Sequence, residues 1–155
     1  MNNEFKEKNI FIREIKKEDV KDLYDFLDNI DDKTKEIFHP HSFNMNTITE
    51  ICNSIKDHYF LMFLNENLIG YSFLRLFNTQ IPSFGIIIKK THSGKGYGTF
   101  LTDWTVEKAR QLGYDKVILK TYKNNIVAKK IYEKIGFKII GETKDKKQYK
   151  MEKIM

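Results

Sequence analysis

Three glycines recur at every second position in the segment Ser93-Gly94-Lys95-Gly96-Tyr97-Gly98. Residues without a Cβ atom let the backbone bend sharply and come close to a ligand. The flanking patterns predict a strand before this turn and a helix after it, so the amides from Gly94 to Thr99 would point outward at a helix N-terminus. Such amides and the positive end of the helix dipole bind anions, and Lys95 adds charge. We therefore expect a pyrophosphate site here, with an ordinary tight turn as the alternative.

The spacing of these glycines separates the turn from two other phosphate-binding motifs. It does not match G-x-x-x-x-G-K-[ST], the nucleotide P-loop. It also lacks the G-x-G-x-x-G spacing and the early N-terminal strand of a dinucleotide-binding fold.

A second set of residues falls on one face of a later helix. Asn125, Ala128 and Tyr132 are spaced i, i+3 and i+7, which brings them to the same side of a helix. A small alanine between an amide and a phenol leaves room for a ligand. A tyrosine there could give its proton to a departing thiolate, because the two groups have similar pKa values of about 10. The alternative is a core tyrosine. Apolar packing beside this face is expected from Ile126, Val127, Ile131 and Ile135.

An irregular segment, residues 33–46, contains Phe38-His39-Pro40-His41. Two histidines at i, i+2 could hold a metal, but no carboxylate or cysteine completes a ligand set, so we expect no metal. The single cysteine, Cys52, lies in an apolar-periodic stretch and is expected to be a buried structural thiol.

Composition limits the class of protein. Apolar residues make up 41% and aromatic residues 14% of the 155 residues, which fits one globular domain over 1–155. Nothing approaches the roughly 20 apolar residues of a membrane span, and the polar segment 1–8 does not match a secretory signal. With one cysteine, these features favour a cytoplasmic protein without membrane contact.

Charge is distributed unevenly along the chain. Residues 1–85 carry a net charge of −4 and residues 86–155 a net charge of +10. The lysines lack the aromatic interleaving and recognition-helix pattern of nucleic-acid binders, so a small anionic ligand is favoured over nucleic acid.

Hydrophobic periodicity predicts seven strands and four helices. Ile86, Ile87 and Ile88 form an apolar run that suggests a strand buried on both faces. The strand before the glycine turn and the strand after its helix should lie parallel, with antiparallel hairpins around them. The expected strands are 11–15, 59–64, 68–77, 84–89, 116–122, 137–143 and 148–154. The expected helices are 17–31, one that begins near Asn46 or Thr47 and reaches His58, 97–112 and 125–135.

Together, the glycine turn and the helix face resemble the GNAT superfamily of N-acetyltransferases. The resemblance covers roughly residues 10–154 and is strongest from Phe84 to Phe137, in particular in Ile131-Tyr132-Glu133-Lys134-Ile135-Gly136-Phe137. It implies an α/β (α+β) fold of three layers, with a mixed central sheet of about seven strands and about four flanking helices.

The resemblance also implies how acetyl-CoA would bind, in a splay between strands 84–89 and 116–122. Backbone groups of Ile86, Ile87 and Ile88 would pair with the pantetheine arm, and Asn125 and Ala128 would line it. Tyr132 would protonate the thiolate, and a β-bulge in strand 84–89 would aim an amide at the thioester carbonyl. The amine attacks directly, without a metal. The pyrophosphate would lie in the turn formed by Ser93, Gly94, Lys95, Gly96, Tyr97, Gly98 and Thr99.

Two positions depart from the pattern of the family. Ser93 stands where the family often has Gln or Arg, which removes a side chain but no amide. Ser83 stands where many members carry a glutamate general base, so another residue or an already neutral amine is needed. Replacement bases could be His39, His41, Asp57 or His58, since histidine has a suitable pKa.

The loop at residues 38–41 falls where the family builds its acceptor pocket, so Phe38, His39, His41 and Ser83 are expected to bind the acceptor. The leading prediction is acetyl transfer to a primary amine of a small molecule, by a monomer or homodimer. The loop is similar to loops of GNAT proteins of surface-sugar pathways, which favours an amino sugar. The alternatives are a protein or peptide acetyltransferase and a non-catalytic acyl-CoA sensor.

Overall fold

The computed structural model describes residues 9–155, which form one seven-stranded sheet in the order β1-β2-β3-β4-β5-β7-β6. Neighbouring strands are antiparallel except β4 and β5, which are parallel. The strands are β1 Ile10–Glu14, β2 His58–Leu64, β3 Asn67–Arg75, β4 Ser83–Ile88, β5 Lys116–Tyr122, β6 Lys138–Glu142 and β7 Gln148–Ile154. The α-helices are α1 Val20–Asp28, α2 Asp32–Ile37, α3 Met45–Cys52, α4 Tyr97–Gln111 and α5 Ile126–Ile135. Short 3₁₀ helices cover Lys17–Asp19 and Lys90–His92.

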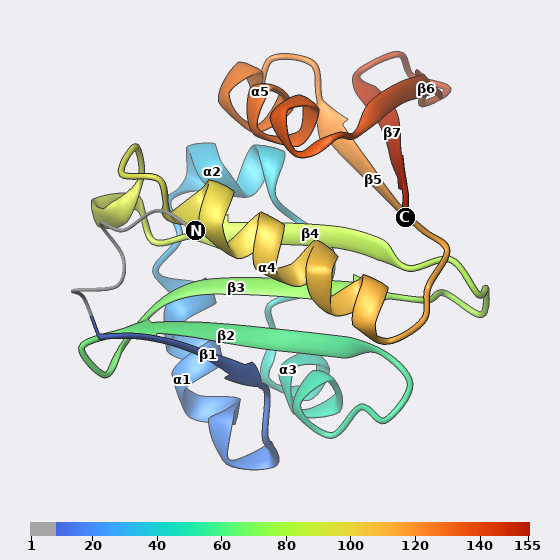
Figure 1. The fold of residues 1–155 in the computed structure, drawn as a ribbon. Coiled ribbons are helices and arrows are strands. Elements are labelled where there is room, and N and C mark those ends of the chain that lie inside the picture. Colours follow the sequence, from blue (N-terminus) through green and yellow to red (C-terminus); the bar gives the residue numbers. More distant parts are fainter. Residues whose placement is uncertain (1–8) are drawn as a thin grey trace.

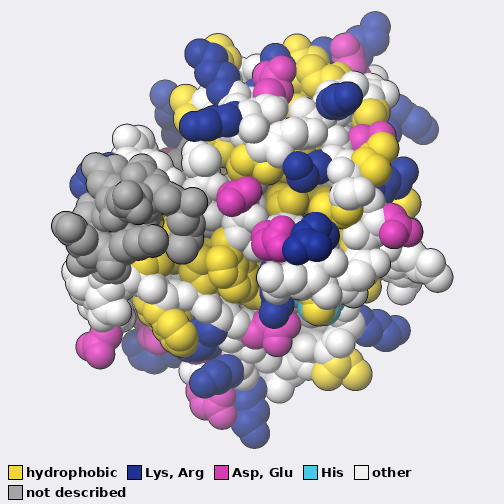
Figure 2. Space-filling view, viewed as in Figure 1, with side chains coloured by type: hydrophobic (Ala, Val, Ile, Leu, Met, Phe, Trp, Pro, Cys, Tyr) yellow, Lys and Arg dark blue, Asp and Glu magenta, His cyan; other side chains and the backbone are white. Residues whose placement is uncertain are grey.

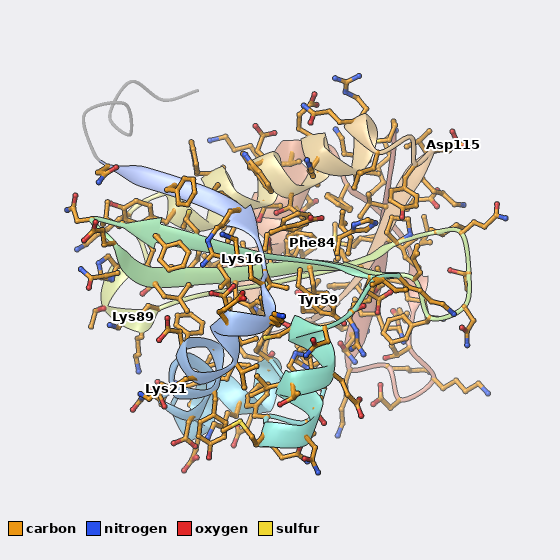
Figure 3. The ribbon with its side chains drawn as sticks, turned by 90° about the horizontal axis from the view of Figure 1, so that it is seen from below. Lys16, Lys21, Tyr59, Phe84, Lys89 and Asp115 are labelled. Carbon is orange, nitrogen blue, oxygen red and sulfur yellow. The ribbon has the colours of Figure 1, made fainter. Side chains whose placement is uncertain are left out.

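Helices cover both faces of the sheet (Figure 1). Seen from below, α4 lies on one side of the sheet while α1 and α3 lie on the other (Figure 3). The buried side chains follow this division. One cluster joins α4 and α5 to the sheet through Phe84, Leu119 and Tyr132, and another joins α1 and α3 to it through Tyr71 and Phe73. The three-layer mixed fold is therefore confirmed.

The sheet opens at the junction of β4 and β5. Ser83 and Ile118 form the one bridge between these strands, supported by the bond from the Ile118 amide to the Pro82 carbonyl, 3.0 Å. Beyond that point β5 turns away from β4, as Figure 1 shows. The splay predicted between these strands is present.

Two expected segments differ from the structure near the N-terminus. The segment 33–46 was expected to be irregular, but α2 begins at Asp32 and extends into it as far as Ile37. This short charged helix has no apolar periodicity, and its N-cap, Asp31, accepts a bond from the Thr34 amide at 2.6 Å. The next helix begins earlier than expected, because Asn44 caps it by accepting from the Thr47 amide. It ends at Cys52, and Ile55 is 94% exposed instead of lying on the apolar face.

Other apolar residues are also more exposed than their spacing suggested. Leu112 follows the last turn of α4 and is 42% exposed. Ile126 and Val127 are 60% and 71% exposed, because they lie in the first turn of α5, beyond the part of that helix that packs on the sheet. Cys52 is buried as expected, and burial raises the pKa of its thiol to about 11. None of the described helices is long and apolar enough to cross a membrane.

Candidate active site

The glycine turn leads directly into α4. Gly94 and Gly96 have φ values of 73° and 91°, in the left-handed region that favours glycine. Gly96 is the N-cap of α4, and no side chain caps that end. Within residues 9–155, the amides of Gly98 and Thr99 donate no hydrogen bond. The turn therefore presents uncapped amides at a helix N-terminus, the arrangement that binds phosphate groups.

Strand β4 has an open backbone edge beside this turn. The Lys89 amide bonds to the Ile69 carbonyl of the β3 side at 2.7 Å, and the polar groups of successive residues alternate in direction along a strand. The groups of Ile86 and Ile88 therefore point toward the splay, whereas those of Ile87 point toward β3. An extended ligand arm would find hydrogen-bonding groups at Ile86 and Ile88 only.

The expectations for this strand are met in part. Ile86 and Ile88 pack on the α4 side of the sheet and Ile87 packs on the α1–α3 side, but all three side chains are only partly buried. The expected β-bulge is absent, since β3 and β4 pair without a register shift from Gly70↔Ile88 to Arg75↔Ser83.

Helix α5 meets both the turn and the strand. A Cβ atom placed on Gly98 would lie 3.6 Å from Ile131 Cδ1 and 3.9 Å from Ile88 Cγ1. The glycine turn, α5 and the end of β4 therefore converge at Gly98. Asn125 caps α5 by accepting a bond from the Ala128 amide at 3.3 Å, so its carboxamide oxygen orients the helix, and its NH₂ group is the part available to a ligand.

Tyr132, on α5, lies on the α4 side of the sheet, in the cluster that joins α4 and α5 to the strands. It is 8% exposed and packs edge-on against Phe84 and Phe137, with ring centroids 6.0 and 5.9 Å apart. Burial raises the pKa of its phenol above the usual value near 10, so the group keeps its proton throughout the neutral range but is a weaker acid than the unburied phenol expected from the sequence. Among the described residues its hydroxyl has no hydrogen-bond partner, which leaves the proton available to a ligand.

The loop between α2 and α3 covers the opposite face of the splay. Three consecutive residues tie it to two strands. His39 Nε2 lies 2.7 Å from the Tyr122 hydroxyl on β5, the Pro40 carbonyl accepts from Arg75 at 2.9 Å, and His41 Nε2 lies 2.9 Å from the Tyr71 hydroxyl. The structure thus brings the predicted acceptor residues Phe38, His39 and His41 to the splay, where Phe38 packs with the α1–α3 cluster.

Of the two loop histidines, His41 is held in place and neutral. Its Nδ1 lies 2.8 Å from the Ser42 carbonyl, which needs a proton on that nitrogen, so Nε2 accepts from Tyr71. Burial lowers the pKa of His41, and the charge of Arg75 lowers it further. Both nitrogens are engaged, which leaves His41 without a free lone pair for an acceptor.

The other proposed bases lie away from the splay or are engaged. Asp57 accepts bonds from the Leu76 amide and the Tyr59 hydroxyl, so it fixes local structure. His58 bonds to Tyr114 at 2.9 Å, past the C-terminal end of α4 and about 22 Å along that helix from the glycine turn. Ser83 forms the bridge at the base of the splay and has no titratable group.

Two features of the acceptor face were not predicted from the sequence. A Cβ atom on Gly85 would lie 2.1 Å from the ring of Phe73, so only glycine lets this ring lie flat over β4; a lone glycine inside a strand is the signal for such an approach. The Arg75 guanidinium stacks over Phe77 at 4.6 Å, and its Nε is buried without a partner among the described residues. No sequence pattern indicates that arrangement.

A cavity of about 1010 Å³ lies on the same face, bounded by α1, α2, the β2–β3 turn and the end of β4. Its apolar wall includes Phe26, Leu68 and Ile87. Four carboxylates line it, and two of them are paired, Asp25 with Lys21 and Asp31 with Lys90. The four carboxylates of the lining are Asp22, Asp25, Asp31 and Glu66, and its two lysines are Lys89 and Lys90. In Figure 3, Lys89 lies at this end of β4, and Phe84 lies farther along the strand, toward the middle of the sheet.

Lysine and arginine side chains are frequent over the upper part of Figure 2, where α5, β6 and β7 lie. Three or more His, Cys, Asp or Glu side chains in a metal-binding arrangement are not found within residues 9–155.

A splayed mixed sheet with a glycine turn at a helix N-terminus defines a class of fold that binds a phosphate-bearing ligand along an open strand. The family described as acetyltransferase (GNAT) domain matches residues 9–138. The chain belongs to the GNAT acetyltransferase family, whose members use acetyl-CoA.

Curated relatives agree with this family. One is the uncharacterized N-acetyltransferase YobR of Bacillus subtilis, 30% identical over 84 residues, which are 54% of this chain and 34% of that protein. Another is N-alpha-acetyltransferase 30 of Dictyostelium discoideum, 30% identical over 112 residues, 66% of this chain and 57% of that protein. The matches therefore span about a third to just over half of these relatives.

Solved structures share the fold. A GNAT acetyltransferase of Streptococcus pneumoniae has a TM-score of 0.80 at 22% identity, covering 95% of this chain and 99% of that chain. Spermidine N-acetyltransferase of Vibrio cholerae has a TM-score of 0.77 at 20% identity, covering 94% and 93%. The aminoglycoside acetyltransferase AAC(6′)-Ib in complex with coenzyme A has a TM-score of 0.75 at 19% identity, covering 94% and 95%.

Proposed function

We propose that residues 1–155 act as one domain that transfers an acetyl group from acetyl-CoA to a primary amine of a small molecule. The observation that carries the proposal is the convergence at Gly98, where uncapped amides of the glycine turn, the open edge of β4 and α5 meet. A pyrophosphate in the turn and an extended arm along Ile86 and Ile88 would both be bound by main-chain groups. Lys95 would add charge beside the phosphates.

Tyr132 is proposed as the acid of this reaction. Its buried phenol keeps its proton at neutral pH and would donate it to the sulfur that leaves when the amide forms. The hydroxyl lies on the α4 and α5 side of the sheet, whereas the acceptor loop lies on the other side. That separation lets the acid act on the leaving group without contacting the amine.

The acceptor is proposed to carry more than one positive charge. The cavity beside Ile87 has four carboxylates and two lysines in its lining, so its charge favours a cationic chain over an anionic one. Structures with this fold include enzymes named for spermidine and for aminoglycosides, which supports polycationic amines as candidates. An amino sugar with several amino groups satisfies the same requirement.

The proposal is tested by thiol release from acetyl-CoA with spermidine, kanamycin and glucosamine, compared with N-acetylglucosamine as an amine-free control. We expect turnover with at least one of the amines and none with the control. Tight coenzyme A binding without turnover of any amine would instead support the acyl-CoA sensor.

A second candidate is the acetylation of protein N-termini, by a monomer or homodimer as for the first. It is favoured by the similarity to N-alpha-acetyltransferase 30 over 112 residues. The α2–α3 loop argues against it, because its ties to Tyr122 and Tyr71 hold it over the splay where a peptide would enter. Faster turnover of peptides with free N-termini than of any small amine would favour this candidate.

A further inference from the structure

Three of the histidines in the described chain bond to a tyrosine hydroxyl. The pairs are His39–Tyr122 at 2.7 Å, His41–Tyr71 at 2.9 Å and His58–Tyr114 at 2.9 Å. They are chemically alike but differ in their surroundings. His41 has its second nitrogen engaged with Ser42, and His58 lies 3.6 Å from Glu14. His39 is exposed, and no partner of its Nδ1 is found among the described residues, so only this imidazole has an open route to water.

The position of Tyr122 follows from the register of the splay. Ser83 and Ile118 form the bridge, and Ile87 and Tyr122 each lie four residues farther along their parallel strands. Ile87 and Tyr122 are therefore at equivalent positions on β4 and β5, the two strands that border the splay. Side chains alternate along a strand, so both project to the same face as the bridging pair. That face carries the α2–α3 loop, and the opposite face carries Tyr132.

Direct acetylation of an amine needs two kinds of proton transfer. The departing sulfur gains a proton, proposed to come from Tyr132 on the α4 face, and the amine loses protons on the face that carries the α2–α3 loop. An alkylammonium, with a pKa of about 10, has no lone pair until it loses a proton. Ser83, at the base of the splay, has no titratable group, and Asp57, His41 and His58 are engaged or distant. Among these candidate bases in residues 9–155, the His39–Tyr122 pair alone combines a position at the splay with access to water.

We propose that Tyr122 and His39 accept the proton of the acceptor ammonium. The inference rests on the proposed acetyl transfer. The ammonium N–H bond breaks as its proton passes to the Tyr122 oxygen, and the phenol proton passes to His39 Nε2, so the nitrogen keeps the electron pair. His39 gives this proton to water. The second proton leaves the nitrogen by the same route as the C–N bond of the amide forms, and the C–S bond breaks as the departing sulfur takes up the proton of Tyr132. Water returns one proton to Tyr132, so one proton is released overall.

Other ionisable groups flank the pair and will influence its pH response. Most of them are cationic at neutral pH. They are Lys35 and Glu36 on α2, His41 on the loop, Arg75 on β3, Lys120 on β5 and Lys150 on β7.

The test compares Tyr122→Phe and His39→Gln with wild type and with Tyr114→Phe, which removes the same hydroxyl from the matched pair at the far end of the sheet. The acceptor is whichever of spermidine, kanamycin and glucosamine is turned over fastest, and kcat/KM is measured from pH 6 to pH 10. General base catalysis contributes about 10²–10⁴-fold, so we expect a loss of about 100-fold at pH 7 for His39→Gln and about 10-fold or more for Tyr122→Phe.

The dependence on pH distinguishes a base from a support for the loop. At pH 10 the amine is already largely neutral, so both variants should come within about threefold of wild type. Imidazole added to His39→Ala should restore part of the activity at pH 7. Tyr114→Phe should match wild type at every pH.

Two results would overturn the inference. One is a loss of the same factor at every pH, which would make the pair a support for the loop. The other is a loss no larger than that of Tyr114→Phe. Wild-type protein that binds coenzyme A but acetylates no amine gives a different result, since it contradicts the proposed acetyl transfer itself and removes the reaction that the pair would serve.

Discussion

The two faces of the splay are built from different parts of the chain. On the α4 face the groups proposed to bind the cofactor are mainly backbone amides and carbonyls, at Gly96, Gly98, Ile86 and Ile88. On the α1–α3 face they are side chains, held by histidine–tyrosine contacts and by the bond from Arg75 to Pro40. Main-chain sites tolerate changes of neighbouring side chains, whereas side-chain sites do not. A cofactor common to a family fits the first arrangement, and an acceptor that varies fits the second.

The largest effect is expected from a change to the backbone side. Gly96→Val places a β-branched residue at a φ of 91° and blocks the approach to amides that would each donate a charge-assisted hydrogen bond. Such bonds contribute about 1.5–3 kcal/mol each, so coenzyme A affinity should fall at least about 100-fold, measured by calorimetry. The matched control is Gly113→Val, at a φ of 90° near the other end of α4. Equal losses of affinity in both variants would show that strain, and not the turn, is responsible.

A smaller effect is expected from removing the hydroxyl of Tyr132, the reactive side chain proposed for the α4 face. Tyr132→Phe keeps the ring against Phe84 and Phe137 but removes the proton, so turnover should fall about 10–100-fold while coenzyme A affinity stays nearly constant. Steady-state kinetics with calorimetry separate the two quantities. Unchanged turnover would remove Tyr132 from the acid role.

On the acceptor side, Gly85→Ala tests how tightly the side chains are packed. The added methyl group would overlap the ring of Phe73, and overpacking of this kind costs about 1–3 kcal/mol. Urea unfolding should show that loss, and the KM of the acceptor should rise more than that of acetyl-CoA. Gly141→Ala, with no atom within 4 Å of the new Cβ, is the control. A rise in both KM values would mean that Phe73 supports the whole splay and not its acceptor face alone.

The smallest effect concerns the pH dependence of stability. Burial lowers the pKa of His41 in the folded protein, so the unfolded chain binds a proton more readily. Stability is therefore complete above about pH 6.5, the usual histidine pKa, and falls as the pH drops below it. Urea unfolding at pH 7.5 and pH 5 should show a loss on the order of 1 kcal/mol or less that His41→Gln lacks. Identical losses in both proteins would contradict a buried neutral His41.

The difference between the two faces also explains what could be predicted from the sequence. The glycine turn and the helix that carries Ala128 and Tyr132 depend on local geometry, so spacing indicated them, whereas the role of Asn125 as the N-cap of α5 was not predicted. The β-bulge did not occur, because β3 and β4 pair in continuous register, and that pairing depends on a strand outside the motif. The direction of the backbone groups of Ile87 depends on the same pairing, because they point toward β3.

The acceptor face could not be predicted in the same way. His39 and Tyr122 are 83 residues apart, and only the position of the α2–α3 loop brings them together. Helix α2 itself has no apolar periodicity and depends on Asp31, which caps it and pairs with Lys90 at 2.7 Å. Contacts between such distant residues carry no local signal in a single sequence.

The single bridge between Ser83 and Ile118 has a consequence for folding cooperativity. β5, β6, β7 and α5 are joined to the first four strands by that bridge, by the packing of α4 and by the contact of His39 with Tyr122. A ligand that pairs with β4 and also contacts α5 would add interactions between the two parts of the sheet where β4 and β5 share a single bridge. The two halves would then unfold as one unit in its presence and with less mutual dependence in its absence.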